Sequence, residues 1–316
     1  TMDRASDRII TVMMTPFMSC GARLPVYVLF ATAFWPTNGQ NLVFGLYLIG
    51  IAAAIFTGYL LKRTALPGAA SAFVMEMPPY HIPTLKGVML RTWDRVRTFM
   101  FRAGKVIVVI VACLAFLNSM GTDGSFGNED SEKSVLSQVG KTIVPVFEPM
   151  GIQEENWPAA VGVFTGIFAK EAVVGTLNSL YDTLAVDKVH EETAATGDEL
   201  AEEGGFSLSD TFAEAVGTIG ENFAGLAGAL SDPLGIRVED LSDQASAAEE
   251  QGVSLGTIDT IKTLFGSSSA VFAYLLMVLL YVPCVAAVAA IYREVGTKWT
   301  VFACAWTLAL GYSAAT

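Results

Sequence analysis

Charged side chains are scarce in this sequence. Of its 316 residues only 16% are Asp, Glu, Lys or Arg, compared with about 25% in ordinary soluble domains, and 53% are hydrophobic. Acidic residues outnumber basic ones by 31 to 19, so no basic face remains that would suit a nucleic acid, and we expect no nucleic-acid partner. With a mean hydropathy of +0.50, the composition predicts a membrane protein.

Cysteine is also rare, and its spacing excludes two common uses. The four cysteines each lie in or beside an apolar run, and they are Cys20, Cys113, Cys284 and Cys304. No two of them share the close CxxC spacing of a zinc or redox motif, and a disulfide framework is not expected. From the surrounding residues, Cys113 and Cys304 are interpreted as packing residues.

A secretory signal peptide is missing from the first residues, because no basic stretch is followed there by an apolar core and a cleavage site. The sequence stops at Thr316 inside an apolar run. From both ends we expect a fragment of a longer chain.

The net charge of −12 is concentrated in one hydrophilic segment. Between Asp182 and Lys262 there are 18 Asp or Glu residues against three Lys or Arg. We interpret 182–265 as an acidic insert outside the membrane. It either concentrates cations electrostatically or is a solvated, partly helical or disordered domain.

Several apolar runs are long enough to cross a bilayer, which takes about 20 helical residues. The run from Leu42 to Leu61 contains no charge at all. Further spans are expected at 99–118, 268–292 and 299–316. Eight of the 19 basic residues fall between 62 and 105, so the positive-inside rule places this connection in the cytoplasm. Its second half is patterned as an amphipathic helix, lying either on the inner leaflet or on the protein's own surface.

Residues 157–181 are apolar but are split at their centre by Lys170 and Glu171. If the connection at 62–105 is cytoplasmic, counting the membrane crossings on either side of 157–181 places both ends of this segment on the outer side. A re-entrant hairpin with the charged pair near its tip satisfies both observations, because non-helical backbone at membrane depth is tolerated where it faces protein or a wet cavity. A single plain crossing stays open as the alternative.

Two apolar stretches are interrupted by proline close to a cysteine. One is Met14–Tyr27, with sequence MTPFMSCGARLPVY, and the other is Leu280–Glu294, with sequence LYVPCVAAVAAIYRE. Proline frees a backbone carbonyl one turn earlier, and paired broken helices are a pointer to a transport site. Thiols and thioethers suit the softer transition metals, which favours Cys20 and Cys284 as ligands, although buried cysteines often only fill space.

Charges inside a membrane are functional candidates by default. Lys170 and Glu171 either act on the transport path or simply neutralise each other. Arg23 either acts there or satisfies carbonyls freed by the nearby prolines. Glu76 lies in a proline-dense cytoplasmic stretch, where it either collects metal together with His81 or is a solvated loop residue. The fold class expected from all these features is an all-α membrane protein, a polytopic bundle with broken or re-entrant helices and an acidic extramembrane insert.

The two proline-broken stretches resemble the two Gate motifs of the FeoB family of ferrous iron transporters. The stretches EMPPYHIPTLKGVMLRTWDRVRTFMFRAGKVIV and GVFTGIFAKEAVVGTLNSLY are similar to further signatures of that family, and the resemblance covers nearly the whole chain outside the acidic insert. Together with the spans and charge pattern above, it divides the chain into five parts. They are a first Gate-type segment at 1–118 with its cytoplasmic connection at 62–103, an external loop at 119–156, the re-entrant or spanning segment at 157–181, the insert at 182–265, and a second Gate-type segment at 266–316.

The resemblance implies multi-pass insertion in the bacterial inner membrane and transport of Fe²⁺. It places Cys20 and Cys284 on the iron path and favours Glu171 and Glu76 as well. Met18 and Ser19, beside Cys20 in the first break, are candidate metal contacts from ligand chemistry. GTP and Mg²⁺ would bind an amino-terminal domain, since no G-x-x-x-x-G-K-[ST] loop occurs in these 316 residues and no catalytic residue is assigned here. Small cytoplasmic Feo partner proteins and a homo-oligomer are further expectations of the family.

Two rival functions stay open from the sequence. One is a carrier of nucleosides or other small solutes, since Gate-type segments occur there as well. The other is a membrane receptor or scaffold without transport, in which the acidic insert is the working part.

Overall fold

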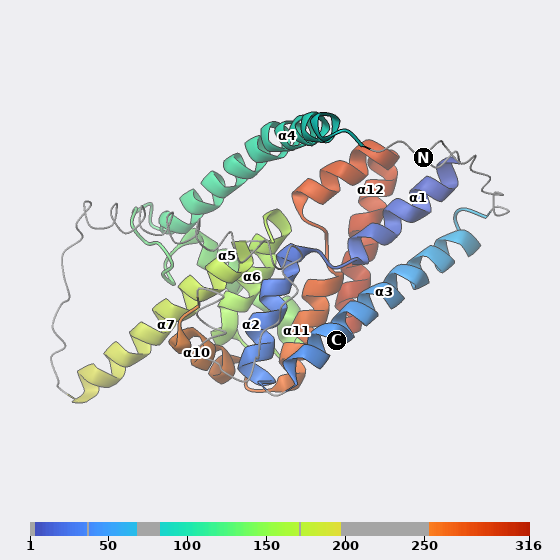
Figure 1. The fold of residues 1–316 in the computed structure, drawn as a ribbon. Coiled ribbons are helices and arrows are strands. Elements are labelled where there is room, and N and C mark those ends of the chain that lie inside the picture. Colours follow the sequence, from blue (N-terminus) through green and yellow to red (C-terminus); the bar gives the residue numbers. More distant parts are fainter. Residues whose placement is uncertain (1–3, 37, 68–82, 171, 197–252) are drawn as a thin grey trace.

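The computed structural model describes residues 4–36, 38–67, 83–170, 172–196 and 253–316. Within these ranges the secondary structure is helical, and the only β-type pairs are two isolated bridges in the loop that follows residue 119 (Figure 1). Three helical stretches are long and apolar enough to cross a membrane. They are Ala5–Phe34, Gly39–Arg63 and Ser268–Ala315. The chain is an all-α membrane protein, as its composition predicted.

The first apolar stretch is a broken helix. Helix α1 (Ala5–Met14) stops ahead of Pro16, two short 3₁₀ turns follow at Thr15–Phe17 and Gly21–Arg23, and helix α2 (Leu24–Phe34) starts with Pro25 in its first turn. Proline is well suited to a first helical turn, where its missing N–H has no partner to lose. The predicted interruption is therefore confirmed, and it leaves Met18 and Cys20 in extended backbone conformation.

Helix α3 (Gly39–Arg63) is continuous and contains the predicted span at 42–61. Helix α4 (Leu85–Ser119) differs from the prediction, which separated a surface helix from a span beginning at residue 99. The structure has one helix of 35 residues, because no proline interrupts the hydrogen-bond ladder between residues 85 and 119. Apolar side chains of its first half, such as Met89 and Trp93, are exposed, so this half is not packed on the described part of the protein's own surface.

The loop predicted at 119–156 contains helix α5 (Val135–Phe147), whose inner face is buried against helix α6 (Trp157–Phe168). Asp130 fixes the preceding loop, since its carboxylate accepts hydrogen bonds from Asn118 at 2.9 Å and from the Ser179 hydroxyl. This part of the predicted external loop is thus built into the helical body.

Helix α7 (Ala172–Thr196) runs back along α6, and the two form a hairpin whose described tip is Ala169 and Lys170. Near the other end of the hairpin, Asn178 of α7 accepts a hydrogen bond from the Thr257 hydroxyl of helix α10 (Leu255–Phe265) at 2.9 Å. A re-entrant segment would have this geometry, and its depth in a membrane stays a prediction.

The acidic insert predicted at 182–265 lies mostly outside the described residues, with 197–252 not described. Its last part belongs to the core, because Ile258, Ile261 and Phe265 of α10 are buried. The Phe265 ring lies 5.3 Å from that of Phe30 and 5.4 Å from that of Tyr274, measured between ring centroids. The solvated portion is therefore shorter than its charge pattern suggested.

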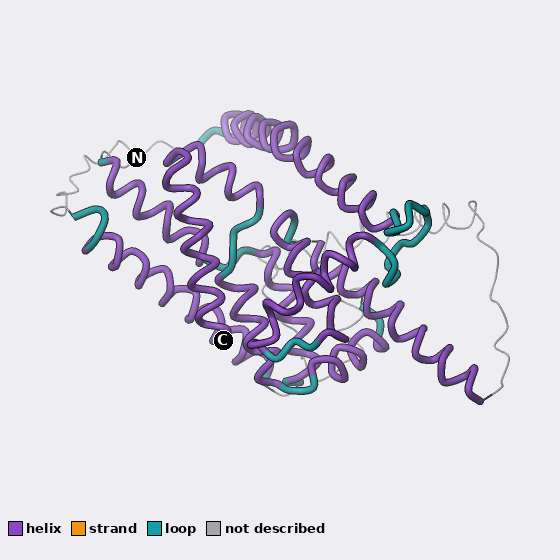
Figure 2. Tube along the Cα trace, turned by 180° about the vertical axis from the view of Figure 1, so that it is seen from behind, coloured by secondary structure: helices purple, strands orange, loops and turns teal. Residues whose placement is uncertain are grey.

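The last apolar stretch is also broken. Helix α11 (Ser268–Leu280) is followed by an extended segment from Tyr281 to Cys284, which runs through the interior of the bundle (Figure 2). Helix α12 (Val285–Ala315) then reverses at Gly296, whose φ of 76° lies in the region open to glycine. This reversal lies inside the turn predicted between Arg293 and Lys298.

A small buried cluster brings the helix ends together. Leu61 of α3 packs with Met13 of α1 and with Ile291 and Ala303 of α12. The basic end of α3 and the reversal at Gly296 therefore lie at one end of the bundle, and α10 lies at the other (Figure 1). The prediction that both basic turns face the cytoplasm requires them to lie at the same end of the bundle, as they do here.

Glycine at position 50 allows α3 to approach the first helix break. A Cβ at Gly50 would stand 2.7 Å from the backbone oxygen of Phe17, whereas a Cβ at Gly45 on the same helix would meet nothing within 4 Å. We predict that Gly50→Ala lowers the stability of the protein by about 1–3 kcal/mol, because a backbone atom must shift.

Gly45→Ala is the matched control, and it should leave stability unchanged or raise it by up to about 1 kcal/mol through helix propensity. Thermal unfolding in detergent measures both. Equal melting temperatures for the two variants would contradict the close approach.

Candidate functional site

The two helix breaks meet at one cavity of about 440 Å³. The first break supplies Cys20 and its neighbours, the second supplies Cys284 and the start of α12, and the tip of the α6–α7 hairpin supplies Lys170. The lining residues are Val12, Thr15, Pro16, Met18, Ser19, Cys20, Arg23, Lys170, Pro283, Cys284, Ala287, Ala290, Ile291 and Glu294. Segments more than 260 residues apart in the sequence thus form one site.

Both cavity cysteines occupy the same position relative to a helix. Cys20 precedes the 3₁₀ turn that leads into α2, and its carbonyl accepts the N–H of Arg23 at 3.1 Å. Cys284 precedes α12, and its carbonyl accepts the N–H of Val288 at 2.9 Å. Each cysteine has extended backbone. The conformation of the helix break, and not that of a helix, therefore sets the direction of its side chain.

The structure brings together four of the six predicted metal-contacting residues. Cys20 and Met18 are exposed toward the cavity, while Ser19 and Cys284 are partly buried. All four cysteines are free thiols. The remaining two predicted residues, Glu171 and Glu76, lie outside the described residues, as does His81.

The other two cysteines do not line this cavity. Cys304 is partly buried on α12. Cys113 is exposed on α4, so its interpretation as a packing residue is wrong within the described structure. The Val/Ile run around it, in which Val109 and Val111 are exposed too, faces outward.

Two buried cations border the thiols. Arg23 is 2% exposed, and its Nη2 donates a hydrogen bond to the Pro16 carbonyl at 3.2 Å. One predicted role of Arg23, satisfying carbonyls near the prolines, is therefore observed. Lys170 is 4% exposed, and its Nζ lies 4.7 Å from the centre of the Tyr281 ring, a cation–π arrangement.

Glu294 is the cavity residue that sequence reasoning missed. It lines the cavity at the end of the second proline-broken stretch. The spacing from Cys284 through Ala287 and Ile291 to Glu294 is three, four and three residues, which places all of them on one helix face. That periodicity was the available signal.

No closed metal cage is present in the part of the chain that the structure describes, since no three His, Cys, Asp or Glu side chains come close enough to hold an ion. The cavity instead offers two thiols, one thioether and hydroxyl groups. These groups suit transient coordination of a borderline or soft metal ion.

A larger cavity of about 1130 Å³ lies on the other side of the first half of α12. It is bordered by α4, by Phe168 at the end of α6, and by the α12 face from Val285 to Arg293. Ala290 lines both cavities. The α12 half-helix is therefore the wall between them.

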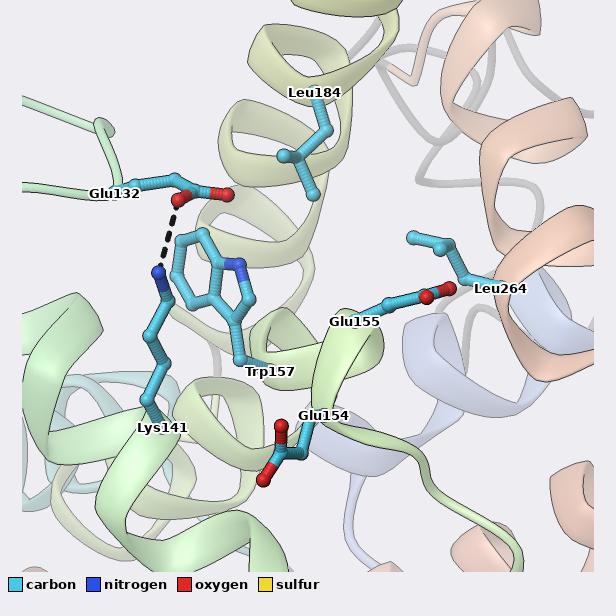
Figure 3. A pocket seen from close by; sticks show the side chains of 7 residues that line it. All are labelled: Glu132, Lys141, Glu154, Glu155, Trp157, Leu184 and Leu264. Atoms are coloured by element: carbon cyan, nitrogen blue, oxygen red, sulfur yellow. Dashed lines mark hydrogen bonds and ion pairs between the residues drawn. The ribbon is translucent and has the colours of Figure 1, made fainter.

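A third cavity, of about 480 Å³, contains several carboxylates near α5 (Figure 3). Lys141 forms an ion pair with Glu132 at 2.9 Å beside the Trp157 ring. Glu154 and Glu155 point in different directions, so their carboxylates do not converge on one point (Figure 3). This cavity does not have the geometry of a metal site.

Comparison with known families agrees with this architecture. The model for the ferrous iron transport protein B C terminus matches residues 43–95, and the Gate model, described as nucleoside recognition, matches residues 100–298. The chain belongs to the FeoB family. The first Gate-type motif, at Met14–Tyr27, lies ahead of both matched ranges in this FeoB-family chain.

Curated relatives extend the match to the motif at Met14–Tyr27. The Fe(2+) transporter FeoB of Salmonella paratyphi A is 40% identical over 317 residues, covering 100% of this chain and 38% of the relative. That of Escherichia coli K12 is 40% identical over 321 residues, with the same coverage. That of Legionella pneumophila strain Lens is 43% identical over 314 residues, covering 99% of this chain and 39% of the relative. No solved structure matches the chain.

The shared cavity predicts that its two thiols can be cross-linked. With Cys113 and Cys304 changed to Ser, a short bifunctional thiol reagent should join Cys20 to Cys284 within one molecule, because both residues line the same cavity. Mass spectrometry of the digested protein would detect the linked peptides.

The complementary variant keeps Cys113 and Cys304 and has Ser at positions 20 and 284. It should give no intramolecular link, since neither of its thiols lines the cavity. A link of equal yield in both variants would refute the arrangement.

Proposed function

We propose that this chain is the iron-conducting membrane part of a ferrous iron transporter, which carries Fe²⁺ across the bacterial inner membrane into the cytoplasm. The observation that carries the proposal is the meeting of the two proline-broken helices at one cavity, with Cys20 and Cys284 on its wall. The printed name of the relatives, Fe(2+) transporter FeoB, supports the choice of metal.

In this proposal the two thiols act as transient ligands. Fe²⁺ entering the cavity exchanges part of its water shell for the sulfur atoms of Cys20 and Cys284, with help from Met18 and Ser19. Contact must stay weak enough for release, which an open set of two thiols allows and a closed cage would not. The carboxylate of Glu294, together with Glu171 and Glu76 as predicted from the sequence, would offset the metal's charge along the route.

The onward route is proposed to pass the α12 half-helix. Ala290 borders both the cysteine cavity and the larger cavity beside α4, and its methyl side chain is a thin barrier. The larger cavity extends to Arg293, near the end of the bundle where the basic turns gather. This is the end that the positive-inside rule assigns to the cytoplasm.

The residues that couple iron transport to GTP are proposed to lie outside this chain. The chain spans 38% to 39% of the length of the curated relatives described above. GTP and Mg²⁺ would bind a domain in the portion not covered, because the 316 residues contain no phosphate-binding loop motif. Small cytoplasmic Feo partner proteins and a homo-oligomer stay part of the proposal, without support from the cavity geometry.

The description of the Gate model as nucleoside recognition favours one rival, a nucleoside carrier. A nucleoside site needs amide side chains and aromatic rings that converge on the base and sugar. The lining of the cysteine cavity includes neither Asn, Gln nor an aromatic residue, which supports a metal ion over a nucleoside. A receptor or scaffold without transport would depend on the acidic insert, most of which lies outside the described residues.

Iron uptake into proteoliposomes by the full-length protein tests the role of the thiols. Changing Cys20 and Cys284 together to Ser should lower the initial rate roughly tenfold or more, because loss of even outer-sphere metal contacts costs about 10-fold to 100-fold in affinity. Radiolabelled Fe²⁺ measures the rate.

The double change of Cys113 and Cys304 to Ser removes the same number of thiols away from the cavity, and it should leave uptake near the unmodified level. Uptake at the same rate by both double variants would rule out Cys20 and Cys284 as ligands.

The proposed route past Ala290 has its own test. Ala290→Phe fills the shared wall of the two cavities and should slow Fe²⁺ uptake strongly while both thiols remain in place. Ala289→Phe is the comparison, since it adds the same ring to the larger cavity without narrowing the cysteine cavity. If the two variants transport iron equally well, the metal does not pass between the cavities at this point.

A further inference from the structure

The larger cavity is amphipathic. Its volume, about 1130 Å³, exceeds the range of about 300–1,000 Å³ that is usual for small-molecule pockets. Apolar side chains of three helices line one part of it, and they are Ile107 and Ile110 of α4, Phe168 of α6, and Val285, Ala286 and Ala289 of α12. Charged residues line another part, and they are Asp94, Arg95 and Lys105 of α4 and Arg293 of α12. A ligand that fits this space needs both an apolar and a charged portion.

The two parts lie at different depths, because α4 and the first half of α12 run in opposite directions along the cavity. Helix α4 begins near the reversal of α12, at the end of the bundle where the basic turns gather (Figure 1). Arg95 and Arg293 therefore lie toward this end, and Ile110 and Val285 lie toward the interior of the bundle. Basic pockets of this kind between membrane helices suit the head group of an anionic lipid.

The positive charge of the cavity is not balanced by the described chain. Three cations border it against one carboxylate, that of Asp94. Arg95, Lys105 and Arg293 form no ion pair with any residue that the structure describes. Lys105 comes just before the apolar part of α4, Ile107–Ser119, where a membrane takes the place of the water that would solvate its ammonium group. An anion at this position would satisfy all three cations.

The cavity is open at its side, and lipid can reach the opening. Phe101 and Tyr292 border the cavity and are 59% and 54% exposed. A second face of α4 also exposes apolar side chains at a helical spacing of three and four residues, which are Leu85, Met89, Trp93, Val96 and Met100. Such a face is typical of a helix that lies among lipids, so the opening beside it is in contact with lipid too.

We propose that this cavity binds an anionic phospholipid from the leaflet on the basic side of the bundle. Its phosphate lies on Arg95, Lys105 and Arg293, and an acyl chain lies along the alanine-rich face of α12. Guanidinium groups pair well with phosphate oxygens, and the long lysine side chain can reach a head group at the membrane surface. An acidic protein segment would match the charge, but it would leave the apolar part of the cavity unfilled.

One consequence for transport rests on the proposed function. Fe²⁺ that passes Ala290 would meet a lining with three cations and one carboxylate, and the net positive charge would repel it. A lipid phosphate on these cations removes the excess charge and offers oxygen atoms to the metal. Lipid binding itself does not require iron, so it is tested without the metal.

Native mass spectrometry of the purified full-length protein tests the site, with phosphatidylglycerol and phosphatidylcholine added in equal amounts. The protein should retain phosphatidylglycerol roughly tenfold better, because basic residues attract an anionic head group and the choline lipid has no net charge. Changing Arg95, Lys105 and Arg293 together to Gln should remove this preference. All three side chains are exposed, so the variant should fold normally.

The matched control changes Lys86, Arg97 and Lys298 together to Gln. It removes the same charge from the same two helices, but none of these exposed residues lines the cavity. The preference for phosphatidylglycerol should therefore remain. An equal loss in both triple variants would indicate general attraction to a basic surface and would overturn the proposal.

Further measurements separate a lipid from other occupants. Ala286→Phe fills the apolar part of the cavity and should lower the retention of phosphatidylglycerol while the cations stay in place. Glycerophosphate, which has no acyl chains, should not displace the lipid at equal concentration. Displacement by glycerophosphate, or unchanged retention in Ala286→Phe, would overturn the proposal. A full-length protein that retains no phospholipid would also overturn it and would point to the rest of the chain as the occupant.

The double change of Cys20 and Cys284 to Ser separates this site from the proposed function. It should leave lipid retention unchanged whatever happens to iron uptake, because neither cysteine lines the larger cavity. Loss of the lipid preference in this variant would contradict a site between α4 and α12.

Discussion

The structure depends on how the backbone N–H and C=O groups find hydrogen-bond partners at the places where its helices break. A proline inside a membrane-spanning run removes a donor and separates the chain into two helical pieces, and polar backbone groups then lie in the middle of an apolar protein. In the first break these groups are paired locally, with the N–H of Met18 on Thr15, the N–H of Arg23 on Cys20, and the Arg23 side chain on Pro16. The tight packing of α3 at Gly50 against Phe17 then holds the break in place.

This constraint also explains why the cavity lies where it does. Each break ends in an extended residue directly before a new helix, and both of those residues are cysteines. The α6–α7 hairpin reaches the same place from another direction, with Lys170 over Tyr281. Three interruptions of regular structure therefore meet, and their meeting leaves a space that straight helices would have filled with side chains.

Much of this arrangement could be predicted because proline acts locally. The interruptions near Pro16 and Pro283 and the reversal between Arg293 and Lys298 follow from residues within a few positions of each event. The meeting of Cys20 with Cys284 was expected only from the likeness of their two motifs. Contacts set by packing were harder to foresee. The burial of α10 at the end of an acidic segment and the outward position of Cys113 depend on neighbours far away in the chain.

Glu294 illustrates the same limit within the site. A glutamate next to an arginine at the end of a span normally suggests a solvated turn. Its position on the cavity wall follows once 285–294 is known to be helical directly after Cys284, because Glu294 then lies on the same face as that cysteine. The register of a helix relative to its cap decides which charges belong to a site.

The half-helix from Val285 to Gly296 has a mechanical consequence. An extended segment precedes it and a glycine reversal follows it, so both of its ends are pivots. Its first turns carry the sequence VAAVAA, and alanine methyl groups interlock little with adjoining helices. Because this half-helix borders both cavities, a small shift of it would narrow one cavity and widen the other, with Ile291 as its buried attachment to α1 and α3.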